Sequence, residues 1–283
     1  MTKIKDKILI IFLIAFFTML ISNSQVLAKK PITNGKGIWI NIWNYPQNPD
    51  MYCEYLRSKG IDKIYLQVSR SNTPAIKHPA QLSKIIESSH SRNIKVIGWS
   101  YVFLQDPLSD AEKLIRAATY KTPSGESLDG IAADIEEVTT SHAVEQFVKR
   151  IREVLGSKYP LIAITFSPLS RSPKASPYNY AWKSIANNFD IIALMTYWHG
   201  STKFRSEQGA YNYTVQTIKK VKEYTEKEDL QIHLIGDGQK TSSQEIIGFL
   251  KAADEYKINA GVSLYPWYTP QEHQLDTLSK FKL

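Results

Sequence analysis

The chain has 283 residues, of which 43% are hydrophobic and 22% are charged, and its formal net charge is +8 at pH 7. The lysines are scattered through helix-like segments, so the excess charge does not indicate a nucleic-acid surface. The single cysteine, Cys53, excludes an internal disulfide and is expected to be a small buried hydrophobe.

The first predicted element is an N-terminal targeting segment. Lysines within the first seven residues precede the apolar stretch 8–21, and the small residue Ala28 stands at the candidate cleavage site. These features are typical of a secretory signal peptide, which is too short for a stable membrane span. We predict that residues 1–28 are removed and that the mature protein is secreted or associated with the cell envelope. Its remaining charge of +6 favours an anionic envelope polymer as a neighbour.

Residues 29–283 match the usual size of one α/β barrel, and no Gly/Ser-rich or Pro-rich linker divides them. Apolar or β-branched runs alternate with helix-like segments, which predicts a parallel sheet closed by eight strands, a single-domain (β/α)8 TIM barrel. The predicted strands are Gly37–Trp43, Lys63–Ser69, Lys95–Phe103, Asp129–Glu136, Leu161–Ser167, Phe189–Trp198, Ile232–Asp237 and Ala260–Trp267.

The intervening helices are predicted from apolar residues at helical spacing, with Ser141 and Ser242 as candidate N-caps. Their ranges are Asp50–Lys59, Gln81–Arg92, Ser109–Tyr120, Ser141–Leu155, Tyr178–Asn187, Tyr213–Glu226, Ser242–Tyr256 and Gln271–Lys280. An open doubly wound sheet is the competing architecture, but it usually has a Gly-rich phosphate turn after the first strand. Here residues 44–47 read Asn-Tyr-Pro-Gln, so no nucleotide cofactor is expected. The histidines show no metal-ligand spacing, so no metal is expected either.

The fourth predicted strand carries two acids at its downstream end, where barrel enzymes place their active residues. Asp134 and Glu136 are two residues apart and therefore share one face of the strand. Each carboxylate raises the pKa of the other, which is the environment that a general acid needs. A pair of solvated acids is the simpler interpretation, but their place in the barrel favours a catalytic site.

Aromatic residues gather at the other strand ends. Sugar faces stack on aromatic rings while sugar hydroxyls need hydrogen-bonding partners, so rings around a few acids predict a carbohydrate cleft. The residues expected to contact the saccharide are Trp43, Tyr101, Trp198, Asp237 and Trp267. His199, in the loop after Trp198, is expected to be a hydrogen-bonding or surface group.

Residues 129–136 read Asp-Gly-Ile-Ala-Ala-Asp-Ile-Glu and resemble the Asp-Gly-x-Asp-x-Asp-x-Glu signature of the family 18 glycoside hydrolases, the chitinase-like barrels. The segment ending in Met195-Thr196-Tyr197 resembles the Met-x-Tyr strand of that family, and residues 261–267 resemble its eighth strand, which ends in Trp. Together these segments span more than half of the predicted barrel.

This resemblance implies a mechanism with a glutamic acid and no enzyme nucleophile. Glu136 would protonate the glycosidic oxygen, and Asp134 would orient the 2-acetamido group whose carbonyl oxygen attacks the anomeric carbon. Tyr197 would hydrogen-bond the acetamide, and Trp267 would form the floor under the reacting sugar. The implied substrate is an N-acetyl amino sugar polymer such as peptidoglycan, chitin or an exopolysaccharide.

Three departures from the family pattern indicate a divergent member. Ala132 replaces the middle Asp of the signature, Trp198 follows Tyr197 where an Asp is usual, and residues 95–100 lack the Ser-x-Gly-Gly of the third strand. Without a carboxylate at Ala132, we expect Asp134 to stay ionised more readily and the pH optimum to change.

Two alternatives remain open. A two-carboxylate retaining glycosidase would use Glu136 or Glu137 as the acid and Asp237 as the nucleophile, with the carboxyls about 5–5.5 Å apart. By strand parity, however, Glu137 faces away from Glu136 and is the weaker candidate. A non-catalytic carbohydrate-binding barrel would instead keep the aromatic cleft without turnover.

Overall fold

The computed structural model describes residues 34–137, 139–176, 178–238, 240–266 and 270–282. The predicted signal peptide, residues 1–28, and the predicted floor residue Trp267 lie outside the described residues. Within the part that is described, none of the helices has the length and apolar character needed to cross a membrane.

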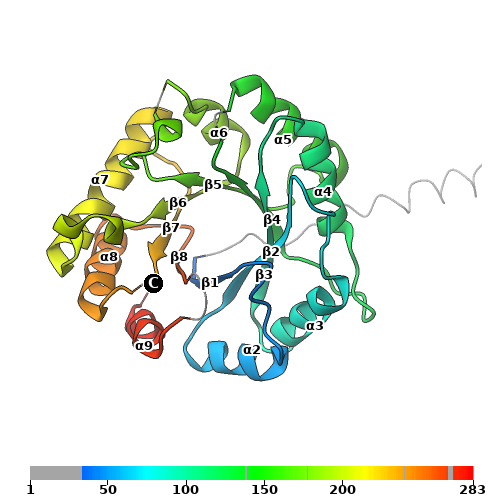
Figure 1. Ribbon diagram of the computed structural model, residues 1–283, viewed down its shortest axis with the longest axis horizontal. Helices are drawn as coiled ribbons and strands as arrows, with labels where there is room; N and C mark the ends of the chain where they lie inside the picture. Colours follow the sequence, from blue (N-terminus) through cyan, green and yellow to red (C-terminus); the bar gives the residue numbers. More distant parts are fainter. Residues whose placement is uncertain (1–33, 138, 177, 239, 267–269, 283) are drawn as a thin grey trace, which may run out of the picture.

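The chain forms a closed barrel of parallel strands, which confirms the predicted fold (Figure 1). The strands follow one another around the ring in chain order, and β1 pairs with β8 to close it. Their bounds are β1 Lys36–Ile40, β2 Lys63–Arg70, β3 Lys95–Val102, β4 Gly130–Ile135, β5 Leu161–Phe166, β6 Ile191–Thr196, β7 Ile232–Asp237 and β8 Val262–Tyr265.

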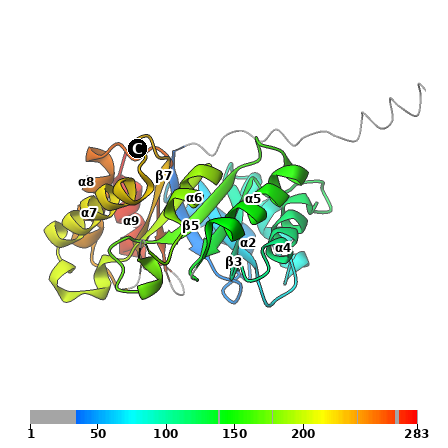
Figure 2. The same ribbon diagram turned by 90° about the horizontal axis from the view of Figure 1, so that it is seen from above.

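Helices surround the barrel and cover the outer faces of the strands, as a view from above also shows (Figure 2). They are α2 Pro49–Ser58, α3 Pro79–His90, α4 Pro107–Thr119, α5 Ser141–Leu155, α6 Trp182–Asn188, α7 Glu207–Thr225, α8 Ser243–Glu255 and α9 Glu272–Lys280. Cys53 is buried in α2, as predicted. Because each connection returns over the outside, the carboxyl ends of all the strands meet at one face.

The largest difference between a predicted and an observed helix start is at α7, and α5 differs in its cap. Helix α7 begins at Glu207 and not at Tyr213, because the Ser206 side chain caps it by accepting a hydrogen bond from the Gly209 amide. Its first turns are too polar to show helical periodicity in the sequence. Helix α5 is capped by Thr140, one residue before the predicted Ser141, whereas Ser242 caps α8 as predicted.

The sixth strand also ends earlier than predicted, at Thr196 instead of Trp198. Short 3-10 turns follow it, η2 Trp198–Gly200 and η3 Thr202–Phe204. Turns of this kind close loops over short distances. Tyr197 therefore stands between the strand and the turns, at the carboxyl end of the barrel.

The inside of the barrel is filled by aromatic and polar side chains. Trp39 stacks on Tyr65 with ring centroids 4.1 Å apart and donates a hydrogen bond of 2.7 Å to the Ser263 hydroxyl. His233 contacts the same hydroxyl through Nε2 at 2.7 Å, and burial lowers its pKa to about 3, so the ring is neutral. A satisfied polar network of this kind fixes the packing of the interior and closes the barrel below the carboxyl-end face.

Candidate active site

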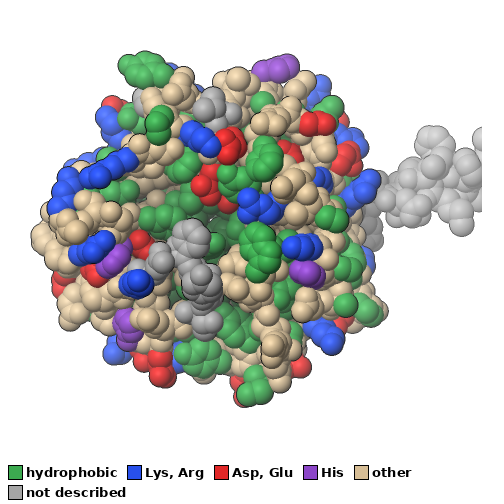
Figure 3. All heavy atoms as spheres, in the orientation of Figure 1, with side chains coloured by type: hydrophobic (Ala, Val, Ile, Leu, Met, Phe, Trp, Pro, Cys, Tyr) green, Lys and Arg blue, Asp and Glu red, His purple; other side chains and the backbone are tan. Residues whose placement is uncertain are grey.

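Two adjoining cavities open at the carboxyl ends of the strands. The larger, of about 630 Å³, lies beside β5, β6 and the turns after β6, and the smaller, of about 330 Å³, lies beside β1 and β2. Both are lined by Trp99, Asp134, Glu136 and Tyr265. Figure 3 shows the hollow at the middle of this face, with acidic and basic side chains around it and hydrophobic ones inside. The predicted acid pair therefore stands where the two cavities meet.

Asp134 is held in β4, opposite Tyr101 of β3, and is only 6% exposed. Its Oδ1 atom has no hydrogen-bond partner among the described residues. Burial, reinforced by the charge of Glu136, raises the pKa of Asp134 well above its ordinary value, while Arg70 opposes the shift. The carboxyl group is thus held in a dry site that disfavours its ionised form.

Glu136 follows the last residue of β4 and shares a hydrogen bond with Asp134. Burial raises the pKa of Glu136, the Glu137 charge adds to this, and Lys174 and Arg70 oppose it. Because both pKa values are raised, the pair retains a proton in a pH range where two isolated carboxyls would have lost theirs.

The expectation that Asp134 stays ionised more readily without a carboxylate at position 132 stays a prediction. Ala132 is fully buried among apolar side chains of the barrel interior. Desolvation raises the pKa of Asp134 even though no acid stands at that position.

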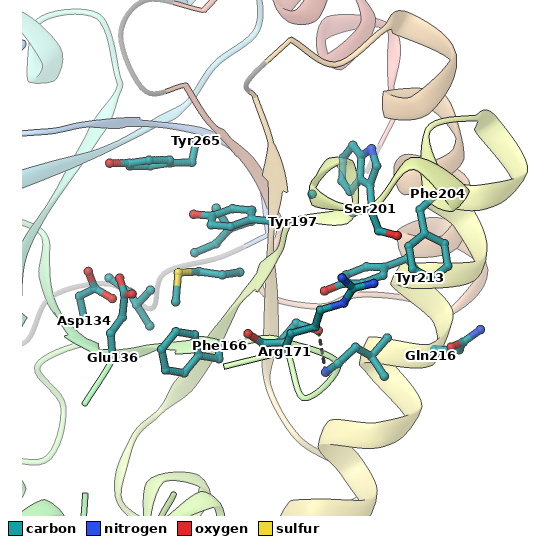
Figure 4. A pocket seen from close by; sticks show the side chains of 18 of the residues that line it. Asp134, Glu136, Phe166, Arg171, Tyr197, Ser201, Phe204, Tyr213, Gln216 and Tyr265 are labelled. Carbon is teal, nitrogen blue, oxygen red and sulfur yellow. Dashed lines mark hydrogen bonds between the residues drawn. The ribbon is translucent and has the colours of Figure 1, made fainter. Parts of the chain in front are cut away.

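Tyr197 is placed next to the acid pair by the end of β6. Its ring stacks on Tyr265 of β8, with centroids 6.2 Å apart. Figure 4 shows the hydroxyls of both rings directed to the side of the cavity on which Asp134 and Glu136 lie. Burial raises the pKa of Tyr197 well above its ordinary value, so its hydroxyl remains a hydrogen-bond donor.

Trp43 and Tyr101 line the smaller cavity. The Trp43 side chain is 65% exposed. The Tyr101 hydroxyl donates a hydrogen bond of 3.1 Å to Glu137, which also pairs with Lys174 at 2.5 Å. The Lys174 contact lowers the pKa of Glu137, which favours the ionised form of this acid.

Comparison with solved structures identifies the type of barrel. The spore cortex-lytic enzyme SleL of Bacillus cereus is 12% identical, with 88% of this chain and 75% of that chain covered and a TM-score of 0.63. A chitinase from Rhizomucor miehei is 12% identical, and the match covers 88% of this chain and 100% of the chitinase chain with a TM-score of 0.63. A family GH18 chitinase from Cycas revoluta, solved with allosamidin, is 11% identical, with coverages of 87% and 98% and a TM-score of 0.62.

The barrel is similar in fold to these chitinases and to the cortex-lytic enzyme. At these identities the similarity shows the fold alone. No protein-family model matches the chain, and no curated protein matches its sequence. Among the described residues, the barrel contains no group of three or more His, Cys, Asp or Glu side chains placed to hold a metal ion.

Two residues predicted for the cleft, Trp198 and Asp237, differ in their relation to the two cavities. Trp198 lines the larger cavity. Trp198 is fully buried, its ring stacks on Phe249, and its Nε1 donates a hydrogen bond of 3.2 Å to Glu245. Its large apolar ring thus packs between the barrel and α8, and its contact with substrate stays a prediction. Asp237 lines neither of the two cavities as the described residues define them, although its charge contributes to the raised pKa of Tyr197.

The sequence analysis gave no role to three residues beside the acids. Arg70 ends β2 one residue beyond the predicted strand, and Tyr265 lies within the predicted eighth strand. Their places at strand ends were recognisable in the sequence, but their nearness to the acids was not. Arg171 lies in an irregular loop of the larger cavity, and no periodic signal marks it.

Proposed function

We propose that this protein is a secreted glycoside hydrolase that cleaves an N-acetyl amino sugar polymer of the cell envelope or of a chitin-like material, with Glu136 as general acid. The observation that carries the proposal is the buried Asp134–Glu136 pair, with both pKa values raised, between the two cavities at the carboxyl end of β4. The chitinases and the spore cortex-lytic enzyme that share the fold support the choice of polymer.

In the proposed reaction, the proton of the pair resides on Glu136 when substrate is bound. Asp134, then a carboxylate, accepts a hydrogen bond from the acetamido N–H. Glu136 gives its proton to the glycosidic oxygen as the acetamido carbonyl oxygen attacks the anomeric carbon and the bond to the leaving sugar breaks. Water then opens the cyclic intermediate, and the Glu136 carboxylate accepts a proton from that water.

Tyr197 contributes by holding the attacking group. Its neutral hydroxyl donates a hydrogen bond to the acetamide, which keeps the carbonyl oxygen close to the anomeric carbon. Trp267 is proposed as the floor under the same sugar, as the family resemblance implies.

The test compares wild type with Glu136→Gln on N-acetylated oligosaccharides and on peptidoglycan. We expect the variant to bind these glycans, but its turnover rate should fall about 10²–10⁴-fold, which is the usual contribution of a positioned acid. The matched control is Glu145→Gln, the same substitution at an exposed position of α5. Allosamidin, the ligand of the Cycas revoluta chitinase, should compete with the oligosaccharides.

A carbohydrate-binding barrel without catalysis is the second candidate function. The observation that favours it is the unpartnered Oδ1 atom of Asp134, two residues beyond Ala132, which replaces an acid of the family signature. Binding without turnover by both wild type and Glu136→Gln would establish this candidate and overturn the proposed enzyme.

A further inference from the structure

Two basic side chains lie beside the smaller cavity: Arg70 lines it, and Lys77 lies over the ring of Trp43, which also lines it. In the part of the chain that the structure describes, neither Arg70 nor Lys77 forms a salt bridge, and neither side-chain cation donates a hydrogen bond. By contrast, Lys174 is neutralised by Glu137 at 2.5 Å. Cations beside a cleft that form no salt bridge are available to bind a ligand.

Both cations are arranged around the same exposed ring. The Arg70 guanidinium carbon lies 5.8 Å from the centroid of the Trp43 ring and 4.6 Å from that of Tyr101, and the Lys77 Nζ atom lies 5.3 Å from the Trp43 ring. Such cation–π contacts hold the charges in place without neutralising them. The backbone at these positions is also fixed, because the Arg70 amide donates to the Thr73 hydroxyl and the Lys77 amide donates to the Val68 carbonyl.

Arg70 also lies near the acid pair. Its charge opposes the rise of both pKa values, but among the described residues no salt bridge joins it to Asp134 or Glu136. On the other side of the acid pair, Arg171 and Lys203 line the larger cavity. A polymer crossing the whole cleft would therefore meet basic side chains on both sides of the acids.

We infer that the sugar stacked on Trp43 carries a carboxylate, which Arg70 and Lys77 recognise. A neutral sugar would use the ring but leave both cations with water only, whereas a carboxylate forms charge-assisted hydrogen bonds with them. An amino sugar that has lost its acetyl group would bring a positive charge and be repelled. This inference rests on the proposed function and specifies its substrate as an acidic N-acetylated glycan.

The experiment measures binding of matched oligosaccharides by calorimetry, using Glu136→Gln to prevent turnover. The first ligand alternates N-acetylglucosamine with N-acetylmuramic acid, which bears a lactyl carboxylate, and the second alternates N-acetylglucosamine with glucuronic acid, which bears a ring carboxylate. The references are the carboxyl-reduced form of each and a chitin oligosaccharide of equal length. The two acidic ligands distinguish a lactyl from a ring source of the carboxylate.

We expect at least one acidic ligand to bind about fivefold to tenfold more tightly than its reduced form at low salt, since two partly exposed charge contacts contribute this much. Raising the ionic strength should shrink the difference. Lys77→Gln should largely remove it, while Lys84→Gln, the same substitution at an exposed position of α3, should preserve it.

The inference would be overturned if each acidic ligand bound with the same affinity as its own reduced form. Tighter binding of the chitin oligosaccharide than of the acidic ligands would overturn it as well. Either result would leave the proposed function standing, because neutral N-acetylated glycans would still bind. If none of the N-acetylated ligands binds, the proposed function fails together with the inference.

Discussion

The raised pKa values of Asp134 and Glu136 have partly different causes. Burial is the largest cause for both, and the Glu136 charge adds to it at Asp134, whereas the Glu137 charge adds to it at Glu136. The charges that adjust this balance come from Arg70, Glu137 and Lys174. Two of them, Glu137 and Lys174, lead to a prediction about the pH dependence of turnover.

Glu137 and Lys174 should move the pH profile in opposite directions. The Glu137 charge raises the pKa of Glu136 and the Lys174 charge lowers it. Turnover needs protonated Glu136, so its alkaline limb reports this pKa. We expect Glu137→Gln to shift the limb to lower pH and Lys174→Gln to shift it to higher pH, as measured by kcat/KM against pH. Shifts of the same sign would contradict the assignment of Glu136 as the acid.

Ionisation of Asp134 should reduce stability. Folding raises the pKa of this carboxyl group, so its protonated form favours the folded state. Stability is therefore lost as the pH rises from the pKa of the unfolded chain through the higher pKa of the folded protein. Asp134→Asn removes this loss. We expect it to raise the free energy of unfolding at pH 7 by about 0.5–2 kcal/mol, the range of common stabilising substitutions.

Chemical denaturation of Asp134→Asn and wild type at pH 7 and at pH 4 measures this effect. The gain should shrink at the lower pH, where the wild-type carboxyl is protonated in both states. A gain of equal size at both pH values would show that the substitution acts through packing and not through charge.

At the scale of elements, the turns after β6 are anchored to α8 by one buried acid. Glu245 accepts hydrogen bonds from Trp198 at 3.2 Å and from His199 at 2.7 Å, and it also completes the capping box with Ser242. Burial alone would raise the pKa of Glu245, but the bonds from Ser242 and His199 lower it on balance. Tyr197 immediately precedes these turns, so the anchor also fixes the position of Tyr197.

Glu245→Ala should therefore weaken both folding and catalysis. Removing the acceptor leaves buried donors unpaired, which costs about 1–3 kcal/mol of stability per group. We expect a lower Tm and a lower kcat, with the alkaline limb of the pH profile unchanged because Glu136 keeps its surroundings. Glu245→Gln retains an acceptor oxygen and should restore part of both losses. Wild-type kcat in the alanine variant would contradict the positioning role.

The same elements show what the sequence could predict. The strands were recognisable because buried parallel strands form short apolar runs, and the fourth-strand acids followed from their spacing alone. The burial of Trp198 was not predictable, because it depends on Phe249 and Glu245, which lie in another element of the fold. The start of α7 was missed because a polar first turn has no apolar periodicity.

At the scale of the whole molecule, the barrel is filled below and open at one end. The buried network of Trp39, Tyr65, His233 and Ser263 closes the interior, so the carboxyl-end cavities are where a polymer can meet the acid pair. Closure of the barrel was predictable from the number of strands. The grouping of basic side chains around the cleft could not be predicted, because the segments that carry them come together only in the folded chain.

The central claim is that the acetamido group of the substrate acts with Glu136 in cleavage. It is tested by initial rates on two aryl glycosides of the same chain length, one with N-acetylglucosamine and one with glucose at the reacting position. We expect wild type to release the aryl group from the acetamido substrate only, because the glucose substrate lacks the attacking oxygen. Equal release from both substrates, or release from neither, would contradict the claim.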